Sequence, residues 1–357
     1  MRSFFRTLAP FALVLAIGCG DAGRKESIQR TNAGHKALGA KQYDSAINEY
    51  KDAIAAYRDN HAAHYYMGEA YRGKKMFDKA AEGYAEAVRI KPDNVMYQMM
   101  YGVALYEDAV QKAREDAARL QNKKPAEVDV DYSLINFDQA EQHLQAAVKL
   151  NPDLFLEHAY LGRIYRATGR PREAAEAFSK AIVANPREWA PYVALSELYR
   201  KWDYPSEAIQ VLIQGVEHVP GQVDKAELHY QLGMAYTEKQ DDAKAIESFT
   251  AAIDASKDKH IAKFMRGQAY LRKGDLKAAD KDLEAFAKAA GPADATNKSI
   301  AQKMRFVRRL MRWLRSDAVS RYYAGPAAVL PFQAVACVAP TDTRLQLLER
   351  ERAFVLG

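Results

Sequence analysis

Histidine is the residue type here that most readily binds a metal or transfers a proton near neutral pH, and the chain has eight. Their positions follow a repeating unit. His64, His158 and His229 occupy one position of that unit, and His61 and His260 each begin a unit. A packing role in the repeat accounts for all five, including the close pair His61 and His64. We therefore predict no metal site and no cofactor.

Sequence motifs that carry catalysis are also missing. The chain has no His-Glu-x-x-His zinc motif, no glycine-rich phosphate loop and no Gly-x-Ser-x-Gly nucleophile turn. Most of the 21 tyrosines fall at repeat positions, which favours a role in the core over a role in a site. We predict that the protein is not an enzyme.

Cys19 has the most distinctive chemical context in the chain. It ends an apolar stretch, residues 7–20, that follows Arg2 and Arg6 and is shorter than the ~20 residues of a membrane span. This pattern is typical of a secretory signal. The small residues before Cys19 and the polar, glycine-containing residues after it resemble a bacterial lipobox.

The lipobox resemblance implies that residues 1–18 are a signal peptide, that Cys19 carries lipid and that residues 19–26 form a tether. An ordinary cleaved signal with an incidental cysteine is the alternative. The residue after Cys19 is Gly20 and not Asp, which favours the outer membrane over the inner one. Cys337 is the only other cysteine, so an acylated Cys19 leaves no intramolecular disulfide.

A 34-residue sequence pattern repeats along the chain, and the secondary-structure elements that position the residues above follow it. The clearest copy is residues 61–94, with small residues at positions 8, 20 and 27 and bulky ones at 11, 17 and 24 of a 34-residue unit. Its marker residues are Gly68, Tyr71, Phe77, Ala80, Tyr84, Ala87 and Pro92. A period of this length indicates a stacked array in which each unit buries its neighbour's face.

Seven units fit the pattern, and each shows two segments with apolar residues at helical spacing. They are residues 27–60, 61–94, 95–154, 155–188, 189–222, 226–259 and 260–293. The spacing resembles the tetratricopeptide repeat. We therefore predict an all-α fold, a right-handed α-solenoid of about seven helix pairs closed by a C-terminal amphipathic capping helix.

The resemblance also implies that the first helix of each unit lines a concave groove. Residues at the positions that point into it give an apolar and aromatic floor with a basic middle, suited to an acidic peptide with apolar anchors. The predicted contacts are Tyr65, Arg72, Met99, Arg163, Arg166, Arg200, Lys201, Tyr230 and Phe264. The Lys and Asn pair with which some relatives clamp a terminal carboxylate is missing. A groove closed by the solenoid's own turns or by the tail remains the alternative.

The third unit carries a 26-residue insertion near residues 107–134. Helical spacing continues to about Asn122, where Lys123, Lys124 and Pro125 end the helix, and a short acidic connector follows. Such an extension is more often a packing arm than a docking site, and both interpretations stay open.

Residues 294–316 are predicted to form a basic capping helix. Residues 294–321 hold eight basic and two acidic side chains, a net charge of +6 that equals the excess of the whole chain. The predicted electrostatic surface is Arg305, Arg308, Arg309 and Arg312. The helix seals the last repeat, with its outer face available to anionic lipid or an acidic partner. Residues 317–357 form a tail without a predicted structure.

Together these features predict a non-enzymatic scaffold in the bacterial cell envelope that binds a protein or peptide. Similar lipoproteins include the type IV pilus pilotins. Two alternatives are a lipid-surface adaptor acting through the basic C-terminal helix and a regulatory repeat subunit of an envelope enzyme complex. An exported protein is not expected to bind nucleic acid. The sequence does not determine the oligomeric state.

Overall fold

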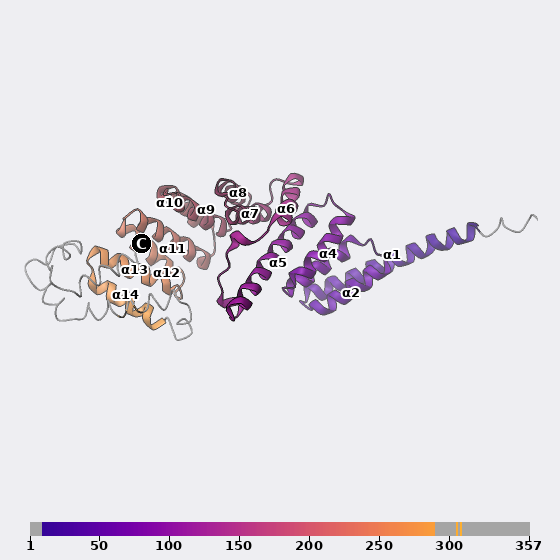
Figure 1. Ribbon diagram of the computed structural model, residues 1–357, viewed down its shortest axis with the longest axis horizontal. Helices are drawn as coiled ribbons and strands as arrows, with labels where there is room; N and C mark the ends of the chain where they lie inside the picture. Colours follow the sequence, from indigo (N-terminus) through magenta and orange to yellow (C-terminus); the bar gives the residue numbers. More distant parts are fainter. Residues whose placement is uncertain (1–8, 290–304, 306–307, 309–357) are drawn as a thin grey trace, which may run out of the picture. The chain divides into compact units, whose positions relative to one another are not determined.

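The computed structural model describes residues 9–289, 305 and 308, and within them the side chains from residue 22 onward. This part of the chain contains fourteen α-helices and no β-strand (Figure 1). The helices are α1 Ala9–Gly39, α2 Tyr43–Ala56, α3 His61–Gly73, α4 Phe77–Ile90, α5 Val95–Gln121, α6 Asp138–Leu150, α7 Phe155–Ala167, α8 Pro171–Ala184, α9 Ala190–Lys201, α10 Pro205–His218, α11 Gln222–Glu238, α12 Asp242–Ala255, α13 His260–Lys273 and α14 Leu276–Ala289. The predicted all-α fold is confirmed. The predicted capping helix and the tail lie outside the described residues, except Arg305 and Arg308.

Each of the seven predicted units forms one pair of consecutive, contacting helices, from α1 with α2 to α13 with α14. At two of the unit boundaries, the last side chain of one unit caps the first helix of the next. Asn60 accepts a hydrogen bond from the Ala63 amide (3.0 Å), and Asn94 accepts one from the Tyr97 amide (3.1 Å). Such caps satisfy amides that have no partner inside the helix.

The alternation of small and large residues holds each pair together. A Cβ on Gly68 would lie 2.8 Å from the Tyr84 ring, and a Cβ on Gly162 would lie 2.6 Å from the Phe178 ring. Both distances are too short for a real side chain, so glycine lets the two helices approach until the aromatic ring of the second helix fills the space.

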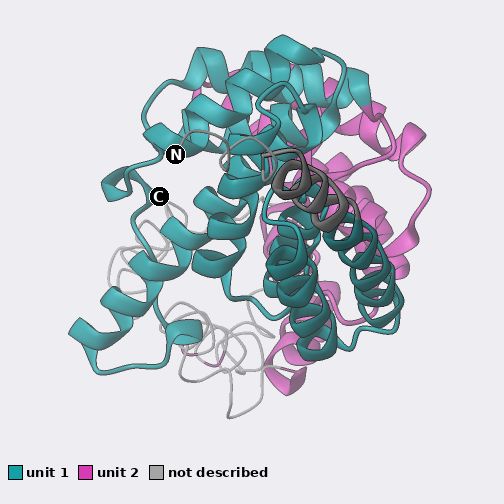
Figure 2. Cartoon of the chain, turned by 90° about the vertical axis from the view of Figure 1, so that its right-hand side faces the viewer, with its two compact units in different colours: residues 1–184 teal, residues 185–357 magenta. Residues whose placement is uncertain are grey.

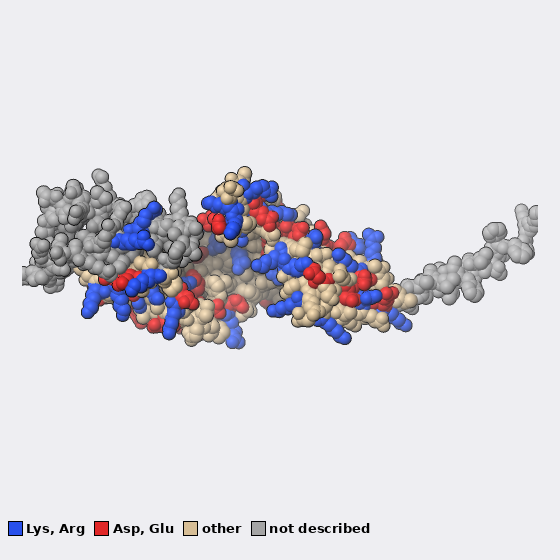
Figure 3. Space-filling model, turned by 90° about the horizontal axis from the view of Figure 1, so that it is seen from below, with Lys and Arg blue, Asp and Glu red and all other residues tan. Residues whose placement is uncertain are grey.

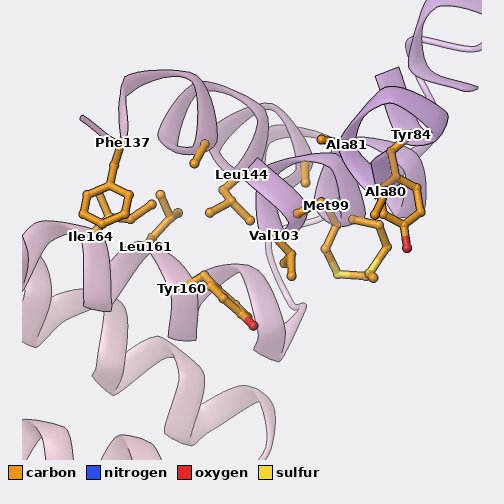
Figure 4. Packing of buried hydrophobic residues seen from close by; sticks show 14 of the residues in the cluster. Ala80, Ala81, Tyr84, Met99, Val103, Phe137, Leu144, Tyr160, Leu161 and Ile164 are labelled. Carbon is orange, nitrogen blue, oxygen red and sulfur yellow. The ribbon is translucent and has the colours of Figure 1, made fainter. Parts of the chain in front are cut away.

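The described chain divides into two compact units, residues 1–184 and 185–357 (Figure 2). The first unit has a core that runs through several repeats and joins residues of α4, α5, α6 and α7 (Figure 4). Leu144, Val103 and Ile164 are fully buried there. The second unit has separate buried clusters around Phe249 and Phe264. No helix in the described part of the chain is long and apolar enough to cross a membrane.

Helix boundaries differ from the predictions in two places. Residues 19–26, predicted as a tether, belong to α1, because Ala22, Arg24, Lys25 and Glu26 are strong helix formers. Residues 223–225, predicted as a spacer, belong to the first turn of α11. The long helix of the insertion, α5, ends at Gln121, next to the predicted Asn122.

The rest of the insertion returns to the core without regular α-helix. It contains two single-turn 3-10 helices, Pro125–Glu127 and Tyr132–Leu134. Val128 is buried in this segment, and Ala118 is buried on α5. The insertion therefore packs on its own helix, which agrees with the interpretation as a packing arm. Leu120 and Leu134 nevertheless stay exposed.

Candidate functional site

The first helices of the repeats form the inner side of each unit. Within the first unit α1 contacts α3 and α5 contacts α7, and within the second α9 contacts α11. The described second helices of successive repeats make fewer contacts with one another. In these three pairs the first helices therefore lie closer together than the second helices, as they do on the concave side of a curved array. All the groove residues predicted from the sequence belong to first helices.

Tyr65 lies in an aromatic cluster on α3 and its neighbours. Its ring stacks on Tyr97 at 4.9 Å and meets Tyr66 edge-on at 5.0 Å and Tyr84 at 5.5 Å. Burial, and then the nearby carboxylate of Glu69, raise the pKa of the Tyr65 hydroxyl. Glu69 also accepts a hydrogen bond from the Tyr84 hydroxyl (2.7 Å). Tyr65 therefore presents only part of its ring to a ligand.

Arg72 is held by a carboxylate that the sequence analysis did not identify. On α3, its Nε donates to Oε2 of Glu107 on α5 (2.8 Å), and its Nη2 donates to Oε1 (2.9 Å). The Tyr160 hydroxyl on α7 donates to the same Oε1 (3.2 Å). Glu107 thus joins three consecutive repeats on their inner side. Glu107 lies four residues after Val103, so helical spacing puts the two residues on the same face of α5. That spacing was the only signal of its role that the sequence offered.

Arg163 and Arg166 of α7 lie beside two tyrosines, and we call Tyr106, Tyr160, Arg163 and Arg166 the tyrosine–arginine cluster. The Arg163 guanidinium lies 5.1 Å from the centre of the Tyr160 ring. Tyr106 meets Tyr160 edge-on at 5.1 Å and stacks on Phe137 at 5.0 Å. Both arginine side chains are exposed, whereas Tyr160 is buried. The cluster offers two cations above an aromatic floor.

The pKa values of Tyr106 and Tyr160 reflect the charges around this cluster. Burial, and next the charge of Glu107, raise the pKa of Tyr160 to about 12, although Arg163 and Arg72 oppose the shift. Burial also raises the pKa of Tyr106, against the positive charges of Arg163 and Arg166. Both hydroxyls are therefore neutral near pH 7, so neither adds a negative charge beside the arginines.

In the second unit, Arg200 joins α9 to α11. Its Nε and Nη2 donate to the two carboxylate oxygens of Glu238 (2.8 and 2.6 Å), and Nη1 donates to Gln231 (2.9 Å). Only 15% of its side chain is exposed. We predicted that Arg200 contacts a partner, but in the structure its side chain links two neighbouring repeats. The adjacent Lys201 is exposed.

Tyr230 of α11 is half-buried beside the Lys259 ammonium, which lies 5.3 Å from the ring centre and pairs with Glu227. Two other predicted contacts are core residues. Phe264 is 1% exposed and packs against Phe286, and Met99 is 7% exposed. Two of these position-5 side chains contact the second helix of their own repeat, Tyr230 against Phe249 and Phe264 against Phe286, so the fold itself covers them.

The histidines contribute hydrogen bonds to the fold. Nε2 of His64 donates to the carbonyl of Arg58 (3.0 Å), and Nε2 of His158 donates to the carbonyl of Pro152 (2.7 Å). Gln98 and Tyr192 donate from the same repeat position to the carbonyl six residues earlier. Among the residues that the structure describes, no group of three metal-ligating side chains comes together.

Several predicted site residues cannot be placed. The Cys19 side chain, Arg309 and Arg312 lie outside the described side chains. Arg305 and Arg308 are helical and exposed. Basic and acidic side chains are interspersed over the described surface in Figure 3, and they form no large area of one sign on that face.

Models of the tetratricopeptide repeat match three stretches of the chain. They cover residues 37–104, residues 126–188 with 160–201, and residues 226–259 with 261–290. No curated protein matches this sequence. The matched stretches include members of all seven helix pairs of the structure.

Solved structures show a similar arrangement of helices. The C-terminal part of a tetratricopeptide repeat-containing protein from Cytophaga hutchinsonii is 15% identical with a TM-score of 0.53, and the match covers 79% of this chain and 98% of that one. A tetratricopeptide repeat protein from Parabacteroides merdae is 13% identical (TM-score 0.49; 82% and 100% covered). PilW, a widely conserved type IV pilus biogenesis factor, is 18% identical (TM-score 0.46; 64% and 92% covered). At identities this low, the likeness concerns the fold alone.

Proposed function

Because this chain belongs to the tetratricopeptide repeat family, whose members bind protein or peptide partners, we propose that it is a non-catalytic scaffold in a bacterial cell envelope. Its partner binds on the inner face of the first unit, at the tyrosine–arginine cluster. This places binding on one part of the predicted groove and removes Met99, Arg200 and Phe264 from the set of direct contacts.

The observation that carries the proposal is the arrangement of exposed arginines over a fixed aromatic floor. Arg163 and Arg166 are exposed side chains of α7. Arg163 lies over the Tyr160 ring, and Tyr106 meets Tyr160 edge-on. Arginine and tyrosine are residue types that dominate binding energy at protein interfaces. Preformed side chains also lose little conformational entropy when a partner binds.

The chemistry of the cluster favours a partner segment with a carboxylate next to an apolar side chain. Guanidinium groups bind carboxylates through two parallel hydrogen bonds, and the partly exposed Tyr106 ring offers an apolar contact beside them. Glu107, an acidic residue of this surface, is already bound by Arg72 and Tyr160. Glu107 therefore does not neutralise Arg163, whose guanidinium lies over the Tyr160 ring.

Attachment to the envelope is the second part of the proposal. The apolar stretch before Cys19 and the small residues that precede it support export and acylation at that cysteine. A lipid anchor on the mature N-terminus would hold the repeats close to the membrane. Partners would then be other envelope proteins, with the periplasmic face of the outer membrane as the proposed location.

The test compares partner capture by the wild-type protein and by the double variant Arg163→Glu/Arg166→Glu. Detergent-solubilised envelope supplies the partners, mass spectrometry identifies them, and a titration with the main purified partner gives the dissociation constant. We expect the double variant to bind at least ~10-fold more weakly, because reversing two contact charges costs more than about 1.4 kcal/mol.

The matched control is Lys149→Glu/Arg172→Glu, which makes the same change in net charge on exposed residues of the second helices α6 and α8. Circular dichroism checks that both double variants stay helical. The control is expected to bind like the wild type. Equal weakening by both variants would show a general charge effect, and unchanged binding by the Arg163/Arg166 variant would place the partner elsewhere.

A further inference from the structure

A polar cavity lies at the edge of the first two repeats, away from the tyrosine–arginine cluster. It has a volume of about 570 Å³ and is open to solvent. Its walls come from the middle of α1 and from the two turns that follow α2 and α4. Six of its lining residues matter here: Arg24, Ile28, Tyr57, His61, Arg89 and Lys91.

Hydrogen bonds among buried side chains fix the floor of this cavity. The Asn60 amide donates to Ser27 Oγ (2.8 Å) and to Thr31 Oγ1 (3.0 Å). Ser27 Oγ in turn donates to the Ala53 carbonyl (2.7 Å). These bonds tie α1 to the turn after α2, so the cavity walls keep their positions without a ligand.

Positive charge dominates the rim. Arg24 stacks over the Tyr57 ring at 5.1 Å and donates only to the neutral Tyr57 hydroxyl, at 3.4 Å. Among side chains 22–289, neither Arg24 nor Lys91 is paired with a carboxylate. The one acidic residue of the lining, Asp59, lies 3.6 Å from the Arg89 guanidinium, which also binds Glu86. Two cations are therefore left for a ligand.

His61 adds a polar group on the inner wall. Its Nδ1 lies 2.7 Å from the Tyr97 hydroxyl, which donates to it in the tautomer that carries the proton on Nε2. That tautomer leaves an N–H donor on the ring in addition to the two cations. The wall also has apolar parts, because Ile90 lines the cavity and Ile28 beside it is 54% exposed.

We propose that this cavity binds a phosphate group, with Arg24 and Lys91 as its charged contacts and His61 as a neutral donor. A phosphate accepts several hydrogen bonds and carries the negative charge that the rim lacks. The apolar wall and the cavity's size leave room for the organic group attached to the phosphate. A membrane headgroup and a soluble organic phosphate share this chemistry.

The position of the cavity favours the membrane as the source. Arg24 lies five residues after Cys19 on the continuous helix α1, a distance of about 8 Å at 1.5 Å per residue. An acyl chain on Cys19 would hold the cavity next to lipid headgroups. This choice of source rests on the lipid anchor proposed above, whereas the phosphate chemistry of the cavity does not.

The experiment uses the chain from residue 19 with Cys19→Ser, so that no acyl chain contributes to binding and every described side chain is retained. The first probe is phosphatidylcholine vesicles with and without phosphatidylglycerol, measured by co-sedimentation. The second probe is glycerol phosphate, measured by calorimetry. The test variant is Arg24→Gln/Lys91→Gln. The control variant, Lys51→Gln/Lys79→Gln, removes two charges from a different surface of the same repeats.

We expect the wild type to bind vesicles that contain phosphatidylglycerol and the test variant to bind them about 30-fold more weakly, at about 1 kcal/mol for each basic residue near an anionic surface. The control variant should stay close to the wild type. Binding of glycerol phosphate without binding of vesicles would assign the cavity to a soluble ligand.

Two results would overturn the proposal: equal losses in both variants, or no binding of either probe by the wild type. Neither result bears on the tyrosine–arginine cluster, because the cluster's own test uses residues of α7. The two proposals can therefore fail separately.

Discussion

His158 donates a hydrogen bond from Nε2 to the carbonyl of Pro152, six residues earlier, at a distance of 2.7 Å. The bond fastens the first turn of α7 to the turn that precedes it. Gln98 makes the equivalent bond to Pro92 in the preceding repeat, at 2.8 Å. This position of the repeat therefore requires a side chain that donates a hydrogen bond, and an aromatic ring is not needed.

Replacing His158 tests that requirement. We expect His158→Gln to keep most of the stability, because the amide can donate as Gln98 does. His158→Leu should lower the free energy of unfolding by about 0.5–1.5 kcal/mol, because it removes the partly buried hydrogen bond to the Pro152 carbonyl. Urea denaturation followed by circular dichroism measures both. Equal losses in the two variants would show that ring packing, and not the hydrogen bond, matters.

Gly162 should not tolerate a methyl group. A Cβ there would lie 2.6 Å from the Phe178 ring, so Gly162→Ala must push the helices of the fourth repeat apart. We expect a loss of about 1–3 kcal/mol in unfolding free energy. The control is Gly39→Ala, because a Cβ at Gly39 would have no neighbour within 4 Å. The prediction fails if Gly162→Ala is as stable as the control.

The ion pair between Arg72 and Glu107 should couple neighbouring repeats. A double-mutant cycle with Arg72→Ala and Glu107→Ala should give an interaction energy of about 1–3 kcal/mol, because two charge-assisted hydrogen bonds form across half-buried surfaces. The comparison pair is Glu176 and Lys180 on α8, which is exposed and should give less than ~1 kcal/mol. Similar energies for the two pairs would contradict the prediction.

The buried carboxyl group of Glu157 should make the stability of the fold depend on pH. Its side chain is fully buried, neither carboxylate oxygen has a partner in the described structure, and burial raises the pKa of this carboxyl. The folded state therefore holds this proton to higher pH than the unfolded state does. The stability that this proton contributes is fully present when the pH is below the pKa of Glu157 in the unfolded state. It is lost as the pH rises through the pKa of Glu157 in the folded state.

Thermal unfolding between acidic and neutral pH checks this sign. Relative to wild type, Glu157→Gln should gain stability as pH rises, because an amide cannot ionise inside the core. Glu173→Gln, an exposed change on the neighbouring helix, should run parallel to the wild type. A Glu157→Gln curve that also runs parallel to the wild type would show that this carboxyl has the same pKa in both states.

Acylation of Cys19 is tested by the intact mass of the mature protein purified from a bacterial envelope. We expect a chain that begins at Cys19 and carries lipid. Cys19→Ser should abolish the added mass and release the protein from the membrane fraction. A mature chain that begins at Asp21 or later, or one that retains Met1, would rule out the anchor.

The sequence by itself determined the repeat and therefore the helix pairs. Gly68 and Tyr84 are sixteen residues apart and recur at fixed positions of the repeat. A small residue on one helix lets the ring of the other pack against it, so this pair already indicated which two helices are in contact. The end of α5 could likewise be predicted, since helical spacing continues to Leu120 and Pro125 follows. Both features depend on residues that are near in sequence.

Only the tertiary structure decided which inner-face residues are accessible. Phe264 and Tyr106 are both aromatic residues of first helices, yet Phe264 is buried against Phe286 of α14, whereas Tyr106 stays partly open. Arg200 and Arg163 differ for the same reason, because Glu238 lies within reach of Arg200, whereas Arg163 meets the ring of Tyr160. Exposure and charge pairing depend on which side chains the packing of other helices brings close, and residues such as Phe286 and Glu238 lie tens of residues away in the chain.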